Sequence, residues 1–115
     1  DLSGQERIGQ ICRELRALIQ QHSPDTAVVE RLFFAKNKKT ALAVSEARGA
    51  ILMLLDEQKI TTIERTPLEV KMAITGNGRA EKHQVAWVVK NILKIPADIT
   101  SDDALDALAL CLMAK

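Results

Sequence analysis

The chain has 115 residues, of which 47% are hydrophobic and 27% are charged, and its formal net charge is +1. That length suits a single domain, residues 1–115, with a hydrophobic core of its own. The small net charge excludes attachment to nucleic acid through overall basicity, so such a surface would need a local cluster of cations. Because no apolar run is long enough to cross a membrane and no signal-peptide pattern precedes the first expected helix, we expect a cytoplasmic protein without membrane contact.

The two cysteines, Cys12 and Cys111, fall within apolar helical patterns. We expect both to be small buried side chains in a reducing compartment. Neither has the spacing to His22 or His83 that a metal site requires.

The first half of the chain predicts two helices and two strands. Apolar residues at helical spacing predict an amphipathic helix over about residues 5–21. Residues 26–30 are nearly all apolar, which predicts a buried strand, and residues 59–64 predict a second one. Residues 38–58 are apolar almost all round, so we expect a helix buried on two sides, one of them against a partner subunit. Gly49 within that helix costs about 1 kcal/mol relative to alanine, which indicates a packing reason for it.

Two features near the first strand point to chemistry. Glu30 ends the strand, where a carboxylate is costly unless it is paired, binds a metal or lies at the mouth of a cleft. An acid that simply points to water is an equal alternative. The connection that follows places Phe33 and Phe34 beside Lys36 and other cations, a mixture that suits stacking on bases and pairing with phosphates. Burial of both rings in the core is an equal alternative.

The second half of the chain predicts three helices. Thr66, Pro67 and Glu69 have the pattern of a helix start, and Gly76 that of a helix end. The turn from Gly76 through Gly78 and Arg79 to Lys82 suits either a phosphate site or an ordinary connection. In the next helix we expect an apolar buried stripe and a second, solvated face that is also able to meet a phosphate backbone or a partner. The buried stripe is Val85, Val88, Val89, Ile92 and Leu93, and the second face is His83, Trp87, Lys90 and Lys94.

An acidic cluster opens the last helix. Asp103 and Asp106 are three residues apart, so their side chains share one helix face and can hold a hard cation such as Mg²⁺. Acids in a first helical turn are also favoured by the helix dipole, with Thr100 or Ser101 as the cap. Considered alone, this stretch favours the capping role.

Five motifs in order resemble the RuvC-type Holliday junction resolvases. They are Val29-Glu30-Arg31-Leu32-Phe33-Phe34-Ala35-Lys36-Asn37, Ala47-Arg48-Gly49, Thr66-Pro67-Leu68-Glu69-Val70-Lys71, Gly76-Asn77-Gly78-Arg79-Ala80-Glu81-Lys82-His83-Gln84-Val85, and Asp103-Ala104-Leu105-Asp106-Ala107-Leu108-Ala109. The resemblance covers essentially the whole chain and implies an α/β protein of RNase H-like fold, here with few strands and about five helices. It also implies a homodimeric endonuclease that resolves four-way DNA junctions in recombination and repair, with the RuvA–RuvB branch-migration machinery among its partners.

The resemblance implies roles for particular residues. Glu30, Asp103 and Asp106 would be metal ligands in a site where four carboxylates hold two Mg²⁺ ions, or Mn²⁺, for phosphodiester hydrolysis. Lys82 would act at the scissile phosphate. The DNA-binding residues would be Phe33, Lys36, Lys71, Gly76, Gly78, Arg79 and Lys82. The metal-ligand role of the two aspartates thereby becomes the better interpretation, and capping by Thr100 or Ser101 is compatible with it.

The chain departs from the family pattern at its start. The family opens with a Gly-Ile-Asp-Pro-Gly type of strand, whose Asp is the first metal ligand, and this sequence has no such strand. We therefore expect the polypeptide as given to lack the amino-terminal three-stranded part and to be inactive or nearly so. The alternatives are a non-catalytic DNA-binding or dimerisation module on the same scaffold, and a helical interaction protein in which the acids only cap.

Overall fold

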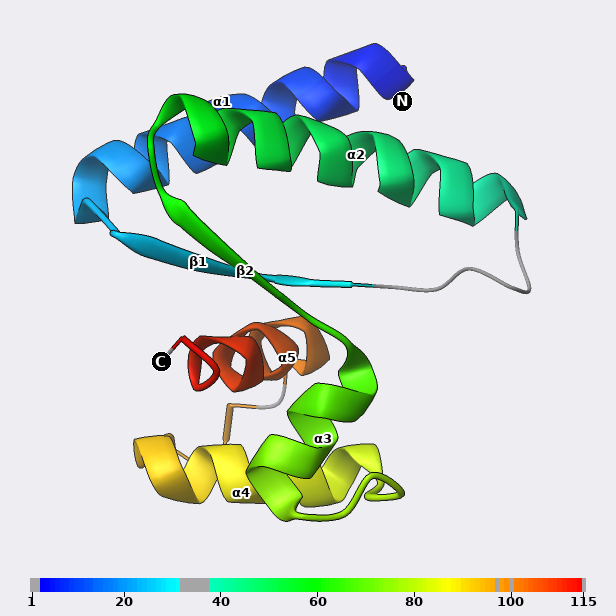
Figure 1. Cartoon of the computed structure of the whole chain (residues 1–115), viewed down its shortest axis with the longest axis vertical. Coiled ribbons are helices and arrows are strands. Elements are labelled where there is room, and N and C mark those ends of the chain that lie inside the picture. The colour runs from blue at the N-terminus through cyan, green and yellow to red at the C-terminus, as the bar shows by residue number, and fades with distance from the viewer. Residues whose placement is uncertain (1–2, 32–37, 97, 100, 115) are drawn as a thin grey trace. The chain divides into compact units, whose positions relative to one another are not determined.

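The structure, a computed structural model, describes residues 3–31, 38–96, 98–99 and 101–114. Within them, five helices and two strands follow in the order α1, β1, α2, β2, α3, α4, α5 (Figure 1). The chain divides into two compact units. Unit 1 consists of residues 1–27 and 33–62, and unit 2 consists of residues 28–32 and 63–115.

Unit 1 is built on two helices that pack against each other, α1 (Gly4–His22) and α2 (Lys38–Glu57). Ser3 caps α1 by accepting a hydrogen bond from the Glu6 amide at 3.1 Å. The buried side chains of this unit are Ile19, Leu54, Leu55 and Ile60. On α2, Leu42 and Met53 are more than half exposed, so one side of this apolar helix is uncovered in the single chain.

The strands β1 (Thr26–Glu30) and β2 (Thr61–Arg65) form a two-stranded sheet. They run in the same direction, because the Thr61 amide donates to the Asp25 carbonyl at one end and the Arg31 amide to the Arg65 carbonyl at the other. A helix between two parallel strands is the usual crossover connection. β1 is half-buried along its length, which corrects the expectation of a fully buried strand. Within the described residues it has one neighbouring strand, so its other edge is not covered by a strand.

The second strand begins later than the sequence predicts. Lys59 adopts a left-handed conformation with φ 57°, and the Ile60 amide donates to the Leu55 carbonyl. These two residues therefore belong to the turn that follows α2, and the strand starts at Thr61.

Unit 2 gathers the helices α3 (Pro67–Thr75), α4 (Lys82–Leu93) and α5 (Asp102–Cys111). The predicted start of α3 is confirmed as a capping box: the Glu69 amide donates to the Thr66 hydroxyl, and the Thr66 amide to the Glu69 carboxylate. Gly76 ends this helix with φ 75°, a conformation that favours glycine. The core of unit 2 is Val70, Val89 and Ala109, one residue from each helix.

Two predictions of burial in unit 2 are wrong. Ile92 and Leu93, in the last turn of α4, are 54% and 39% exposed and are not among the side chains that pack against the core of unit 2. Cys111 is exposed at the end of α5, whereas Cys12 on α1 is half-buried. Among the described helices, none is long and apolar enough to cross a membrane.

Candidate active site

A cavity of about 650 Å³ lies within unit 2, at the carboxyl end of β1. Its walls come from β1, α3, α4 and α5 together with the residue that precedes α4. The lining residues are Glu30, Pro67, Val70, Lys71, Glu81, Lys82, His83, Val85, Ala86, Lys90, Asp102, Leu105, Asp106, Ala109 and Leu110. Charged side chains from four separate segments therefore open onto one apolar-walled space, which we call the carboxylate–lysine cavity.

Glu30 reaches this cavity because it is the last residue of β1. Burial raises the pKa of its carboxyl group, the negative charge of Asp106 raises it further, and the positive charge of Lys82 lowers it in part. Two carboxylates that repel each other in a partly desolvated space hold negative charge that a cation would neutralise.

Lys82, the first residue of α4, pairs with acids on α5. Its Nζ lies 3.6 Å from Oδ2 of Asp102 and 3.6 Å from Oδ2 of Asp106. The charge of Asp106, and then that of Asp102, raises the pKa of Lys82. All three side chains are more than half exposed, so water screens these ion pairs and each is weak. The amine is therefore held loosely and is able to exchange its partners.

Four residues predicted from the sequence, Glu30, Lys71, Lys82 and Asp106, line the same cavity. Asp103 is exposed and is not among the lining residues, so its role as a ligand stays a prediction.

The acid that sequence reasoning missed is Asp102. Ser101 caps α5 by accepting a hydrogen bond from the Ala104 amide at 3.3 Å, as predicted, and the helix therefore begins at Asp102. Asp102 then lies one turn before Asp106, and both face Lys82. The four-residue spacing between Asp102 and Asp106 was the available signal in the sequence. It indicates a shared helix face only if the helix already includes Asp102, which depends on Ser101 being the cap.

The predicted phosphate-binding turn lies between α3 and α4. The Asn77 side-chain oxygen accepts a hydrogen bond from the Arg79 amide at 2.9 Å, and the Arg79 side chain is exposed. A Cβ atom on Gly78 would lie 2.8 Å from Cδ1 of Leu68, so glycine lets the turn approach α3 closely. Phe33 and Lys36 lie outside the described residues.

A divalent cation fits the donors of the carboxylate–lysine cavity in part. Among the described residues, no group of three or more histidine, cysteine, aspartate or glutamate side chains is placed to hold a metal ion. Mg²⁺, however, is usually held by one or two carboxylates, with water and substrate phosphates completing its shell. Glu30, whose pKa is raised by burial and by the charge of Asp106, and Asp106 itself are a donor pair of this kind.

The parallel strands with a helical crossover, and the carboxylate that ends β1 beside an acid of α5, define an α/β protein, and the solved structures described below give it the RNase H-like fold. The family model for crossover junction endodeoxyribonuclease RuvC matches residues 1–114, and the chain belongs to this family. The predicted family and fold class are thereby confirmed.

Relatives and solved structures agree with this assignment. RuvC of Petrotoga mobilis is 47% identical over 104 residues, which make up 90% of this chain and 64% of that protein. RuvC of a Roseiflexus species is 44% identical over 112 residues, which make up 97% of this chain and 67% of that protein. A Thermus thermophilus RuvC structure is similar to this chain with a TM-score of 0.87, and a second one, described as a complex with Holliday junction substrate, with a TM-score of 0.90. Both are 31% identical in sequence, and each match covers 96% of this chain and 67% of the other chain. The chain thus spans about two thirds of the length of these relatives.

Proposed function

We propose that this chain carries part of the active site of an endonuclease that resolves four-way DNA junctions by phosphodiester hydrolysis, in recombination and repair. The observation that carries the proposal is the meeting of Glu30 and Asp106, from β1 and α5, with Lys71 and Lys82 in one cavity. The family assignment and the junction complex of the Thermus thermophilus protein support it.

In the proposed site, Glu30 and Asp106 hold a divalent cation, and Asp103 is a further ligand. A bound Mg²⁺ or Mn²⁺ ion supplies Lewis-acid stabilisation of the phosphate oxygens, and two ions per subunit are the expected number. Lys82 and Lys71 balance the charge of the DNA backbone at the cavity. Because Lys82 is held only by weak ion pairs with Asp102 and Asp106, it can turn to a phosphate when DNA binds.

The proposed DNA surface extends beyond the cavity. Gly76, Gly78 and Arg79 contact the backbone at the turn before α4, where amides and a cation lie together. Phe33 and Lys36 are proposed to contact bases and phosphates at the junction point. Selectivity then rests mainly on the shape of the junction and on backbone contacts.

We propose a homodimer for the intact protein. The uncovered side of α2, with Leu42 and Met53, supports a subunit contact there. Two copies related by a two-fold axis would present two sites to a four-way junction that is itself nearly two-fold. Association with the RuvA–RuvB branch-migration machinery in the cytoplasm belongs to the same proposal.

The experiment uses a synthetic four-way junction with Mg²⁺ or Mn²⁺. It compares the chain alone with a fusion that places before it the three-stranded amino-terminal part expected for the family. We expect the fusion to bind the junction and to nick it in a symmetric pair. Glu30→Gln and Asp106→Asn in the fusion should abolish nicking and leave binding intact. A fusion that binds no junction in preference to duplex overturns the proposal.

The chain-alone arm of the experiment tests the expected inactivity. Junction binding without nicking supports that expectation, and robust paired nicking contradicts it. Both readouts use the unaltered chain, so this arm requires no substitution.

One observation favours a second candidate function, a non-catalytic DNA-binding or dimerisation module. It is the lack, within the described residues, of three acids placed together for a metal. This candidate predicts that Asp103→Asn and Asp106→Asn leave every property of the fusion unchanged.

A further inference from the structure

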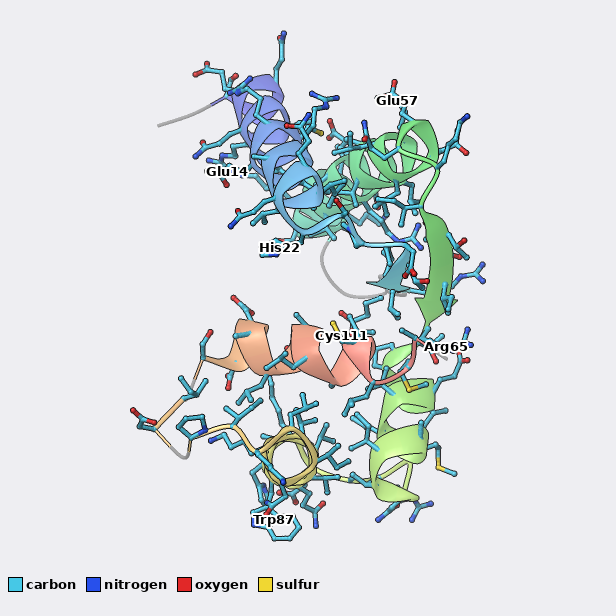
Figure 2. All side chains as sticks on the ribbon, turned by 90° about the vertical axis from the view of Figure 1, so that its left-hand side faces the viewer. Glu14, His22, Glu57, Arg65, Trp87 and Cys111 are labelled. Carbon is cyan, nitrogen blue, oxygen red and sulfur yellow. The ribbon has the colours of Figure 1, made fainter. Side chains whose placement is uncertain are left out.

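A second cavity of about 640 Å³ lies within unit 2, beside the end of α3 and the outer side of α4. Its lining residues are Ile74, Thr75, Asn77, Ala80, His83, Gln84, Trp87 and Val88. Trp87 is 67% exposed and stands out from α4 on the side away from α5 (Figure 2). It is also the single tryptophan of the sequence. An indole ring is thus presented to solvent beside a hollow that has both apolar and polar walls.

Two amide side chains at this cavity have their oxygens already engaged. The Asn77 Oδ1 accepts from the Arg79 amide at 2.9 Å, and the Gln84 Oε1 accepts from the Glu81 amide at 2.7 Å. These contacts fix which way each amide points, so its NH₂ group is the free donor. Both NH₂ groups lack a hydrogen-bond partner among the described residues. The cavity therefore offers donors to a ligand with carbonyl or ring-nitrogen acceptors.

The second cavity adjoins the carboxylate–lysine cavity. His83 lines both of them. Along α4, Trp87 follows Lys82 by five residues, which is about 7.5 Å of helix axis. The same five residues turn by about 140° around the helix axis, so Lys82 and Trp87 point to different sides of α4. His83, which lines both cavities, lies between them, and a strand whose phosphate contacts Lys82 would pass over His83 to bring a base to Trp87.

We propose that Trp87, Asn77 and Gln84 form a binding site for an unpaired nucleobase of the DNA held at the carboxylate–lysine cavity. The indole ring stacks on the base, and the two amide groups donate to its edge. Stacking on an aromatic ring tolerates every base, so the site would select unpaired over paired nucleotides rather than one sequence. The proposal rests on the proposed function, because that function makes DNA the occupant.

An apolar side chain of a protein partner is the competing occupant of this cavity. It would cover Trp87 but would leave the NH₂ groups of Asn77 and Gln84 without acceptors, which is costly on burial. A base satisfies both the ring and the donors. The arrangement therefore favours the base.

The test measures Trp87 fluorescence in this chain during titration with a short oligothymidylate, which needs no junction recognition. Binding is followed in parallel by the anisotropy of a dye on the oligonucleotide. We expect stacking to quench Trp87 in step with binding. Trp87→Ala should weaken the affinity by about 5- to 150-fold, the range for loss of one stacked base. Trp87→Phe, which keeps an aromatic ring, should retain most of the affinity.

Ile92→Ala is the matched control, because Ile92 lies on the same helix, is 54% exposed and does not line the cavity. It should leave both readouts unchanged. Gln84→Glu keeps the oxygen that caps the Glu81 amide but removes the NH₂ donor, so it should weaken binding. An unchanged affinity in Trp87→Ala, or saturated binding without quenching, overturns the site. Absence of oligothymidylate binding also overturns it.

The failure of this site and that of the proposed function are distinguishable. If oligothymidylate quenches Trp87 but the fusion shows no preference for a four-way junction, the base site is supported and the proposed junction resolution is contradicted. If the fusion nicks junctions and Trp87→Ala leaves oligothymidylate binding unchanged, junction resolution is supported and the base site is contradicted. A change in Trp87 emission that depends on protein concentration without DNA would show self-association at this face and would overturn the proposal.

Discussion

The two units of the chain differ in what their surfaces present. Unit 1 pairs α1 with α2 and leaves apolar side chains of α2, such as Leu42 and Met53, uncovered. Both cavities described above are lined by unit 2 residues alone, and they hold the charged groups and the exposed indole. The difference teaches that the proposed subunit contact and the proposed chemistry fall on separate parts of one sequence. Substitutions in the two units should therefore affect different measurements.

The largest expected effect comes from the core of unit 1. Leu54 is fully buried, and Leu54→Ala should lower the free energy of unfolding by about 2–5 kcal/mol. Unfolding in urea can be followed by circular dichroism for all helices and by Trp87 fluorescence for unit 2. A single domain requires both midpoints to fall together. A fall in the dichroism midpoint with an unchanged Trp87 midpoint would show that the units unfold separately.

Replacing one glycine in each unit by alanine should change the stability of the chain by a smaller amount, downward in unit 2 and upward in unit 1. Gly76→Ala in unit 2 should cost about 1–2 kcal/mol, because residue 76 has φ 75° and alanine is strained there. Gly49→Ala in α2 should stabilise the chain by about 0.5–1 kcal/mol, because a Cβ atom at Gly49 meets nothing within 4 Å. Thermal melting of both variants checks the pair. If Gly49→Ala instead destabilises the chain, the result would support the prediction from the sequence that glycine is needed there for packing.

Local patterns in the sequence predicted local structure well. The Thr66–Glu69 capping box, the stop at Gly76 and the cap at Ser101 each depend on residues within one helical turn, and all three are confirmed. The family motifs also identified Glu30 and Asp106, which meet at the carboxylate–lysine cavity.

The predictions that were wrong or incomplete concern properties that depend on contacts between helices and strands. Ile92 has the helical spacing of a buried residue, yet it is more than half exposed and does not pack against the core, whereas Ile95 does. The pairing of Asp102 with Lys82 needs α4 and α5 to pack side by side, so the four-residue spacing of Asp102 and Asp106 within α5 does not by itself predict it. The Trp87 cavity also depends on two helices, so the sequence placed Trp87 only on a solvated face that is able to meet a phosphate backbone or a partner.

The smallest expected effect is the pH dependence of two glutamates within unit 2. Burial and the charge of Asp106 raise the pKa of Glu30 above its usual 4.5, so the folded state binds this proton more tightly than the unfolded state. The stability from Glu30 is therefore present below pH 4.5 and is lost as the pH rises through the folded-state pKa. Glu30→Gln should then raise the urea midpoint at about pH 7, and this gain should vanish toward about pH 4.

Glu69 is the matched control, because its pKa moves the other way. The hydrogen bonds from Thr66 hold the pKa of Glu69 below 4.5, so its stabilisation is present above pH 4.5 and is lost as the pH falls through the folded-state pKa. Glutamine can still accept the bond from the Thr66 amide, so Glu69→Gln removes the charge and keeps the cap. Its urea midpoint should be lower than that of the unaltered chain at neutral pH and should converge with it in acid. Equal pH profiles for the Glu30 and Glu69 variants would contradict the assignment of Glu30 to a desolvated, acid-facing position, and with it the charge that a bound cation is proposed to neutralise.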